Sequence, residues 1–339
     1  MTHISKAQGA TPVSRDSEQS LSGLAAHRGR WAAGGVVAAA LVAAALFNRS
    51  SARRAEANTP PAGKFIDVEG VRLHYADRGA GSVVVLLHGN GVLLQDYEAS
   101  GVLDLAAKDH RVIAFDRPGF GYSDRPRSRI WTPTEQGRLI AQALEQLGIE
   151  EAVVVGHSWG TLVALSMALE HPELVSGLVL LSGYYYGTAR PDVVPGSLPA
   201  IPLIGDLLAQ TLSPLFGRLI APVAVKASFA PGPVSDKFAN LPAAMMLRPS
   251  QIRATAGDTG LMVPAAIALS QRYGELNLPI IVMAGRGDLI AHVSEHAEPF
   301  ARQVEGADLR IVEGQGHLFH YAVPSQVVAA IRDVQRPRE

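Results

Sequence analysis

The sequence predicts an α/β fold: a mostly parallel sheet of eight strands, helices on both faces of that sheet, and a helical insertion. Three observations predict it. Apolar runs of strand length recur along the chain, helical patterns lie between them, and residues 187–278 interrupt this alternation without a strand-like run. The 339 residues are 47% hydrophobic and 18% charged, so the chain can bury a large core.

The N-terminal region differs in composition from the rest of the chain. Residues 1–30 are mostly polar and small, and we expect them to be disordered. Residues 31–47, WAAGGVVAAALVAAALF, carry no charge and would rise roughly 25 Å as a helix, close to the thickness of a hydrocarbon core. Because arginines flank both ends, the sequence predicts a single-pass N-terminal membrane anchor whose orientation stays open.

Two alternatives to the anchor stay open at this point. In the first, a signal peptide is cleaved and the protein is exported; residues 55–57, AEA, fit a cleavage site but lie far beyond the apolar stretch. In the second, the apolar stretch is a surface helix of a soluble protein. Residues 48–63 are charged and contain two prolines, which predicts a linker, and the folded domain is expected to begin near Lys64.

Eight segments have the pattern of strands. Residues 64–79 alternate apolar and polar side chains around Glu69 and Gly70, which predicts a two-stranded hairpin. Five continuous apolar runs are typical of strands buried on both faces of a parallel sheet: residues 82–89, 111–116, 152–157, 177–183 and 279–285. A less apolar run, residues 308–314, predicts an edge strand, and the clearest helices are predicted at residues 134–147, 161–170, 293–304 and 325–334.

These segments divide the folded chain into a core and an insertion. The core is predicted in two parts, residues 64–186 and 279–339. The insertion, residues 187–278, is dense in proline and apolar residues and is predicted to form a helical cap. We expect the cap to lie over the carboxyl ends of the strands, where open α/β sheets bind ligands.

Ser158 is the candidate nucleophile. It stands in GHSWG, residues 156–160, between a buried strand and a predicted helix. At such a sharp turn the serine adopts strained backbone angles, and the residues two before and two after it must be small. Gly156 and Gly160 meet that requirement, so the turn is expected to present the hydroxyl to a substrate.

A serine hydroxyl needs a base, and the base needs an acid that orients it. Asp288 follows the late buried strand in IIVMAGRGD, and His317 lies on the glycine-flanked loop EGQGH, so they are the predicted acid and base. Glu295 and Asp308 are weaker acids because neither follows a buried strand. His320 is the nearest rival of His317, but it lies in an apolar stretch.

The oxyanion of an acyl-transfer intermediate needs two N–H donors. The backbone N–H of Trp159 is the first candidate, and that of Asn90, in the loop after residues 82–89, is the second, with Gly91 as the fallback. His88 is expected to shape this loop rather than to take part in the chemistry.

Five motifs, LLHGNG, FDRPGFGYSDRP, GHSWG, AGRGD and GQGH, follow one another in this order. Their order resembles that of the α/β-hydrolase superfamily, and the resemblance covers the chain from about residue 65 to the C-terminus. It implies the α/β-hydrolase fold and a serine hydrolase with Ser158, Asp288 and His317 as its triad. It also implies that Asp116, in DRPGFGYS, braces a loop rather than acting in catalysis.

The motifs around the serine are similar to those of epoxide hydrolases and haloalkane dehalogenases, which use an aspartate nucleophile. A serine that attacked an alkyl carbon would form an ether, so Ser158 points to attack on a carbonyl and an acyl-enzyme. The sequence therefore favours a carboxylic-ester hydrolase with a small hydrophobic acyl substrate. Carbon–carbon hydrolases, prolyl aminopeptidases and cofactor-free haloperoxidases remain alternatives, and so does a ligand-binding protein without turnover.

Composition excludes several other classes of function. The chain has no cysteine, which rules out disulfides, thiolate metal sites and a cysteine nucleophile. Thirty basic and 31 acidic residues give a net charge of −1 without a basic stripe in the body of the chain, so a nucleic-acid partner is not expected. No cofactor and no metal are expected either.

Overall fold

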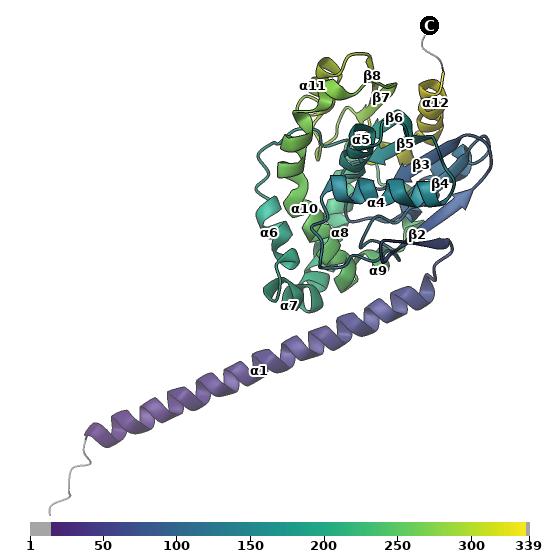
Figure 1. The fold of residues 1–339 in the computed structure, drawn as a ribbon. Coiled ribbons are helices and arrows are strands. Elements are labelled where there is room, and N and C mark those ends of the chain that lie inside the picture. Colours follow the sequence, from purple (N-terminus) through teal and green to yellow (C-terminus); the bar gives the residue numbers. More distant parts are fainter. Residues whose placement is uncertain (1–14, 337–339) are drawn as a thin grey trace, which may run out of the picture.

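The computed structural model describes residues 15–336 (Figure 1). Its centre is a sheet of eight strands in the order β1-β2-β4-β3-β5-β6-β7-β8. β1 and β4 pair with β2 in antiparallel fashion and the other neighbours are parallel, so the predicted mostly parallel sheet is confirmed. The strands are β1 (Lys64–Val68), β2 (Val71–Arg78), β3 (Val83–Leu87), β4 (Arg111–Phe115), β5 (Ala152–His157), β6 (Val175–Leu181), β7 (Ile280–Gly285) and β8 (Ala307–Val312).

Helices cover both faces of the sheet, because its central strands are apolar on both sides. One face packs against α4 (Pro133–Gln146), α5 (Gly160–Glu170) and α11 (Ala297–Gln303). The other face packs against α2 (Gln95–Ser100), α3 (Val102–Ala106) and α12 (Pro324–Val334). Helix α11 begins four residues later than predicted, because residues 293–296 form a turn.

The insertion between β6 and β7 holds helices and no strand, and all of it belongs to the described residues. It consists of α6 (Val193–Ser197), α7 (Ile204–Gln210), α8 (Leu212–Phe229), α9 (Ala243–Met246) and α10 (Pro249–Ser270), with short 3₁₀ helices at Leu198–Ala200, Asp236–Asn240 and Tyr273–Glu275. Figure 1 shows these helices together on one side of the sheet. The helical content of this insertion therefore agrees with the prediction for residues 187–278.

The N-terminal helix α1 (Arg15–Asn58) is longer than the sequence predicts. Disorder is predicted for residues 15–30 and a linker for residues 48–63, yet both 15–30 and 48–58 continue the helix, and only residues 59–63 connect it to β1. Alanine, arginine and glutamate favour helix strongly, and the buried Asn48 and Ala55 pack the second segment against the body. The expected disorder of residues 1–14 lies outside the described residues.

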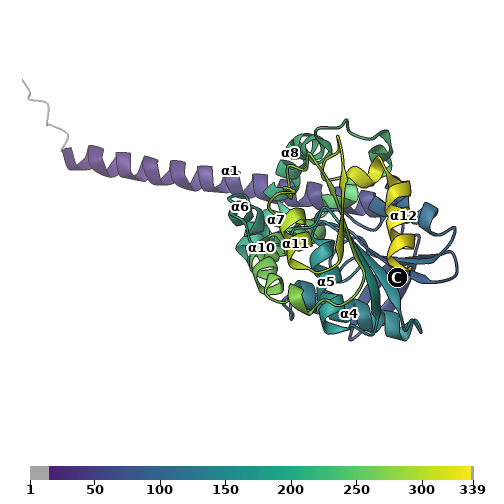
Figure 2. The ribbon, with the colours of Figure 1, turned by 90° about the horizontal axis from the view of Figure 1, so that it is seen from above.

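Helix α1 runs along the body with its C-terminal part and projects away from it with its N-terminal part (Figures 1 and 2). Asn48 joins α1 to the body through two hydrogen bonds. Its Nδ2 donates to the carbonyls of Gln210 at 3.0 Å and Thr211 at 2.7 Å, where α7 meets α8. Glu56 near its end forms an ion pair with Arg248 at 2.8 Å. The described residues contain two helical stretches long and apolar enough to cross a membrane, Gly34–Asn58 within α1 and α8.

Candidate active site

Ser158 lies on a strained turn between β5 and α5, as the sequence predicts. Its φ of 52° is in the left-handed region, where a residue other than glycine costs on the order of 1–3 kcal/mol. A Cβ on Gly156 would lie 2.6 Å from the carbonyl oxygen of Gly160, and one on Gly160 would overlap the carbonyl of Leu87. Gly156 therefore permits the close approach of β5 to the start of α5, and Gly160 permits that of α5 to β3.

The structure brings Ser158, His317 and Asp288 into one chain of hydrogen bonds. Ser158 Oγ lies 2.8 Å from His317 Nε2, and His317 Nδ1 lies 2.8 Å from Asp288 Oδ2. The three residues follow the carboxyl ends of β5, β8 and β7, and parallel strands place these ends at one edge of the sheet. Asp288 and His317 are buried, while Ser158 is partly exposed.

Asp288 is held in its charged form. Burial raises the pKa of Asp288, but the charge and the hydrogen bond of His317 outweigh this and lower the pKa below its usual value, helped by two backbone N–H groups. These N–H groups belong to Ile290 and Ala291 and donate to Asp288 Oδ1 at 2.8 and 2.9 Å. The second carboxylate oxygen is thus left to orient the imidazole.

The loop after β3 lies beside Ser158 and His317. Asn90, Gly91 and Trp159 line one cavity together with Ser158 and His317. Trp159 precedes the first turn of α5, where backbone N–H groups have no partner within the helix. Asn90 and Trp159 therefore lie beside Ser158, and their role as the two oxyanion donors stays a prediction.

Arg117 and His88 hold the peptide that links Gly89 to Asn90. The carbonyl of Gly89 accepts from Arg117 Nη2 at 3.0 Å and from His88 Nδ1 at 2.8 Å. In a planar trans peptide the N–H points away from the carbonyl, so these two bonds also fix the direction of the Asn90 N–H. Burial, and then the charge of Arg117, lower the pKa of His88 to about 4, so His88 is a neutral brace for this loop, consistent with the role expected for it.

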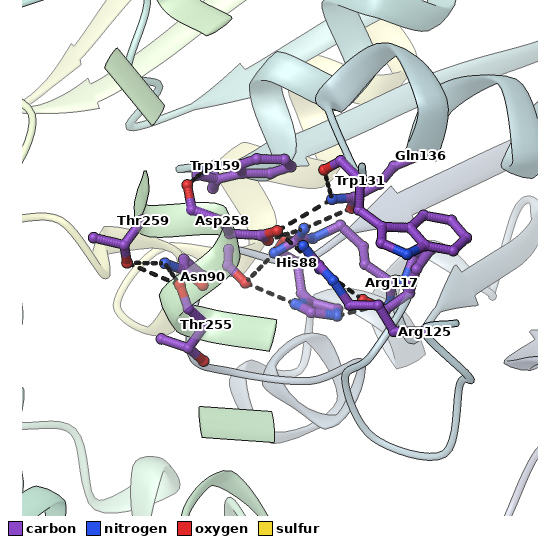
Figure 3. Close-up of polar contacts among 12 residues, drawn as sticks. His88, Asn90, Arg117, Arg125, Trp131, Gln136, Trp159, Thr255, Asp258 and Thr259 are labelled. Atoms are coloured by element: carbon purple, nitrogen blue, oxygen red, sulfur yellow. Dashed lines mark hydrogen bonds and ion pairs between the residues drawn. The ribbon is translucent and has the colours of Figure 1, made fainter. Parts of the chain in front are cut away.

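Asp258 of the cap helix α10 completes a buried network under this loop (Figure 3). Its carboxylate accepts from Arg117 Nη1 at 2.7 Å, from Arg125 Nη1 at 2.9 Å and from Gln136 Nε2 at 3.2 Å. Its backbone carbonyl accepts from the indole Nε1 of Trp159 at 2.9 Å. Asp258 is not among the residues predicted from the sequence; the only signal is one acid within a long, largely apolar helical stretch.

The side chain of Asn90 also contacts the cap (Figure 3). Its Nδ2 donates to Thr255 O at 3.2 Å and to Thr259 Oγ1 at 3.0 Å, both on α10. The same cap helix therefore contacts both residues that are expected to supply the oxyanion donors, Asn90 and Trp159.

The cavity above Ser158 has a volume of about 290 Å³. The cap contributes much of its wall, including Ala224 and Val225 of α8 and Met262 of α10. Its polar groups besides Ser158 and His317 include Arg190 and Asp192, which pair with each other at 2.7 Å. A second depression of about 740 Å³ lies at the opposite edge of the sheet and contains none of the residues discussed above.

The remaining sequence candidates lie elsewhere. Glu295 and Asp308 are exposed, and Asp308 pairs with Arg310 at 2.8 Å. Asp116 is buried and accepts from Leu94 N at 2.9 Å and Tyr122 N at 3.0 Å, which fits the expected bracing of a loop. None of the three contacts Ser158 or His317 among the hydrogen bonds of residues 15–336.

His320 lies behind the site in a buried group with Asp96 and His157, whose possible metal-ligating atoms are within 4.8 Å of one another. His320 Nε2 lies 3.0 Å from Asp96 Oδ2, and Tyr321 donates to Asp96 Oδ1 at 2.8 Å. Burial raises the pKa of Asp96, but the charge and hydrogen bond of His320 outweigh it and hold the pKa at about 2. Hydrogen bonds therefore join His320 and Tyr321 to Asp96, whereas His157 Nε2 bonds to the carbonyl of His317 at 3.2 Å.

Comparisons with known proteins agree with this architecture. A profile of the alpha/beta hydrolase fold matches residues 82–322. A 2-hydroxymuconate semialdehyde hydrolase of Pseudomonas putida is 29% identical over 274 residues, which are 73% of this chain and 94% of that protein. Epoxide hydrolase 3 of Siraitia grosvenorii is 35% identical over 144 residues, 41% of each chain.

The solved structure of Est816, described as an N-acyl homoserine lactone degrading enzyme, superposes with a TM-score of 0.61. At 24% identity, over 80% of this chain and 99% of that one, it shows the likeness of the fold alone. The profile covers most of the chain, and the strand order and the cap insertion match the architecture that the motifs imply. The chain is therefore a hydrolase of the α/β-hydrolase family.

Proposed function

We propose that this hydrolase cleaves a carboxylic ester, or a related acyl bond, of a hydrophobic substrate through an acyl-enzyme. The observation that carries the proposal is the hydrogen-bonded chain from Ser158 through His317 to the ionised Asp288. A serine activated in this way attacks carbonyl carbon. The largely apolar cavity wall formed by the cap supports a hydrophobic acyl group.

In the first half-reaction, Ser158 Oγ attacks the ester carbonyl while His317 Nε2 takes the hydroxyl proton. The N–H groups of Asn90 and Trp159 stabilise the negative oxygen of the tetrahedral intermediate. The carbon–oxygen bond of the ester then breaks, and the departing alcohol takes the proton from His317. In the second half-reaction water attacks the acyl-enzyme by the same steps and releases the acid.

The contacts of the cap acids weigh against an aminopeptidase. Such an enzyme needs a free acid beside the cavity to hold the substrate amine. Asp192 is paired with Arg190 at 2.7 Å, and Asp258 is paired with Arg117 at 2.7 Å. The 2-hydroxymuconate semialdehyde hydrolase of Pseudomonas putida keeps carbon–carbon hydrolysis as the second candidate, since it aligns with 73% of this chain.

A substrate panel distinguishes these reactions. The full-length protein is assayed with p-nitrophenyl esters of rising acyl length, with proline amides and with 2-hydroxymuconate semialdehyde. We expect ester hydrolysis to dominate kcat/KM, with a maximum set by the cavity of about 290 Å³. Higher kcat/KM on the semialdehyde would replace the ester proposal by the second candidate, and turnover of no compound would favour a ligand-binding role.

We further propose that α1 is the single-pass anchor of this enzyme. Gly34–Asn58 contains a window apolar enough to cross a membrane, its residues 34–47 carry no charge and are mostly exposed, and the contacts of α1 with the body begin only near Leu41. A truncated protein without residues 1–40 therefore keeps the packed end of the helix, including Asn48. We expect alkaline carbonate to release this protein from membranes with its activity retained, because most of the apolar anchor is gone.

Removal of residues 1–14 alone is the matched control, since it leaves all of α1 in place. This control should resist carbonate and require detergent for release. Carbonate-resistant association of the protein without residues 1–40 would contradict a single anchor at the N-terminus.

A further inference from the structure

The cap exposes an unusual amount of apolar surface. Among the described side chains, 23 large hydrophobic residues are exposed; twelve of these lie between residues 194 and 223 of the cap and six lie on α1. We call the twelve the cap surface. Single exposed apolar residues are ordinary, but a contiguous apolar area marks a contact with a partner or a membrane.

Helix α8 forms the clearest part of the cap surface. Its exposed apolar residues follow the helical repeat, so they lie on one face of the helix. They are Leu212, Leu215, Phe216, Leu219, Ile220 and Val223. An amphipathic helix normally turns such a face toward the core, whereas α8 turns it outward.

Helix α8 cannot itself cross a bilayer, although it is long and apolar enough. Its inner residues Ala224, Val225 and Ser228 line the cavity above the candidate nucleophile. The carbonyl of Ser228 accepts from Leu318 N at 3.0 Å, next to the candidate base. The helix is thus part of the folded domain, and its outward face is free to lie on a surface.

The position of α1 indicates which surface this is. Asn48 follows the last residue of the apolar stretch, Phe47, and binds the carbonyls of Gln210 and Thr211, where α7 meets α8. The Arg218 guanidinium of α8 lies 5.1 Å from the centre of the Phe47 ring. The apolar part of α1 therefore continues directly into the cap surface, and Figures 1 and 2 show α6–α8 on the side from which α1 projects.

The arginines of α1 agree with a boundary between hydrocarbon and headgroups close to Phe47. Arg49, Arg53 and Arg54 are exposed just after the apolar stretch, where lipid headgroups would meet the helix. Residues 194–223 contain two charged side chains, Asp206 and Arg218, and both are only partly exposed. If α1 enters a bilayer up to Phe47, the α7–α8 junction lies at the boundary between hydrocarbon and headgroups.

We propose that the cap surface docks on the lipid bilayer that α1 enters. The apolar face of α8 then lies in the interface, immersed by about 5–10 Å as other amphipathic helices are. The opposite face of α8 lines the cavity, so one helix has lipid on one side and the candidate active site on the other. This docking is a second membrane contact, separate from the anchor and from the reaction.

The absence of cysteine makes a direct test possible in the full-length protein. Single cysteines are introduced as Leu219→Cys and Leu203→Cys in the cap surface, Val42→Cys on α1, and Glu151→Cys in the depression at the opposite edge of the sheet. Leu219 and Leu203 are 75% and 83% exposed, and Glu151 is also exposed, so Glu151 is the control on the side away from the cap. Each variant carries an environment-sensitive fluorophore and is reconstituted in phosphatidylcholine vesicles.

Two quenchers then report the surroundings of each label. We expect aqueous iodide to quench L219C and L203C at least about threefold less than E151C, and nitroxide-bearing lipids to quench them as they quench V42C. Iodide quenching of L219C equal to that of E151C, with V42C lipid-exposed, would overturn the docking and leave the anchor. Labels at 219 and 203 that are shielded from both quenchers would overturn the docking on lipid and assign the surface to a second copy of this chain.

All four labels exposed to iodide would contradict the anchor and the docking together. None of these readouts depends on turnover, so the result is independent of the proposed ester hydrolysis.

Discussion

Replacing Ser158 with alanine is expected to lower kcat by about 10⁶-fold, the loss typical of removing a serine nucleophile from an intact triad. The hydroxyl lies 2.8 Å from His317 Nε2, and no other serine hydroxyl of residues 15–336 makes that contact. The same change should abolish labelling by a fluorophosphonate probe, since the probe phosphonylates the activated serine. Steady-state kinetics and gel fluorescence measure the two effects.

Ser182→Ala is the matched control for this experiment. Ser182 is also buried, follows the neighbouring strand β6 and has a positive φ of 46°, but its hydroxyl has no hydrogen-bond partner. We expect this variant to keep both activity and labelling. Persistent labelling of the Ser158→Ala protein would remove Ser158 from its proposed role.

Replacing Asp288 with asparagine is expected to lower kcat by about 10⁴-fold while the fold stays intact. The amide has nearly the same shape as the carboxylate. It lacks the negative charge that stabilises an imidazolium, and its NH₂ group favours the wrong tautomer of His317. The pKa of Asp288 lies below its usual value because His317 and two backbone N–H groups outweigh burial, so the native side chain is charged at neutral pH.

Glu295→Gln and Asp308→Asn serve as controls, since both acids are exposed and lie outside the hydrogen-bonded chain. Their activity should stay within about twofold of the native protein, as for surface changes away from a site. A loss of only about tenfold for Asp288→Asn would mean that another acid orients His317. Circular dichroism and a denaturation curve establish that each variant is folded.

The core and the candidate triad could be predicted because their signals are local. Each short, continuous apolar run reveals a buried strand, and Ser158, Asp288 and His317 each follow a predicted strand. Gly156 and Gly160 indicate the sharp turn at Ser158 in the sequence itself. The parallel direction of these strands is enough to predict that the three residues lie at one edge of the sheet.

Asp258 could not be predicted, because its partner Arg117 lies 141 residues away in the sequence. No pattern within one segment joins the two residues; only the packing of the cap on the core does. The linker prediction is wrong for a different reason. Residues 48–58 are charged, which suggests a solvated connection, yet their helix propensity and the contact of Asn48 with the cap continue the helix.

The buried network around Asp258 also bears on how the protein unfolds. Breaking one partner of a buried ion pair costs about 3–5 kcal/mol, a large part of the stability of a domain. The pairs of Asp258 with Arg117 and Arg125 cross the boundary between cap and core, so the cap cannot swing away as a hinged lid and leave the core unchanged. We therefore expect cap and core to unfold as one cooperative unit, in a single thermal transition.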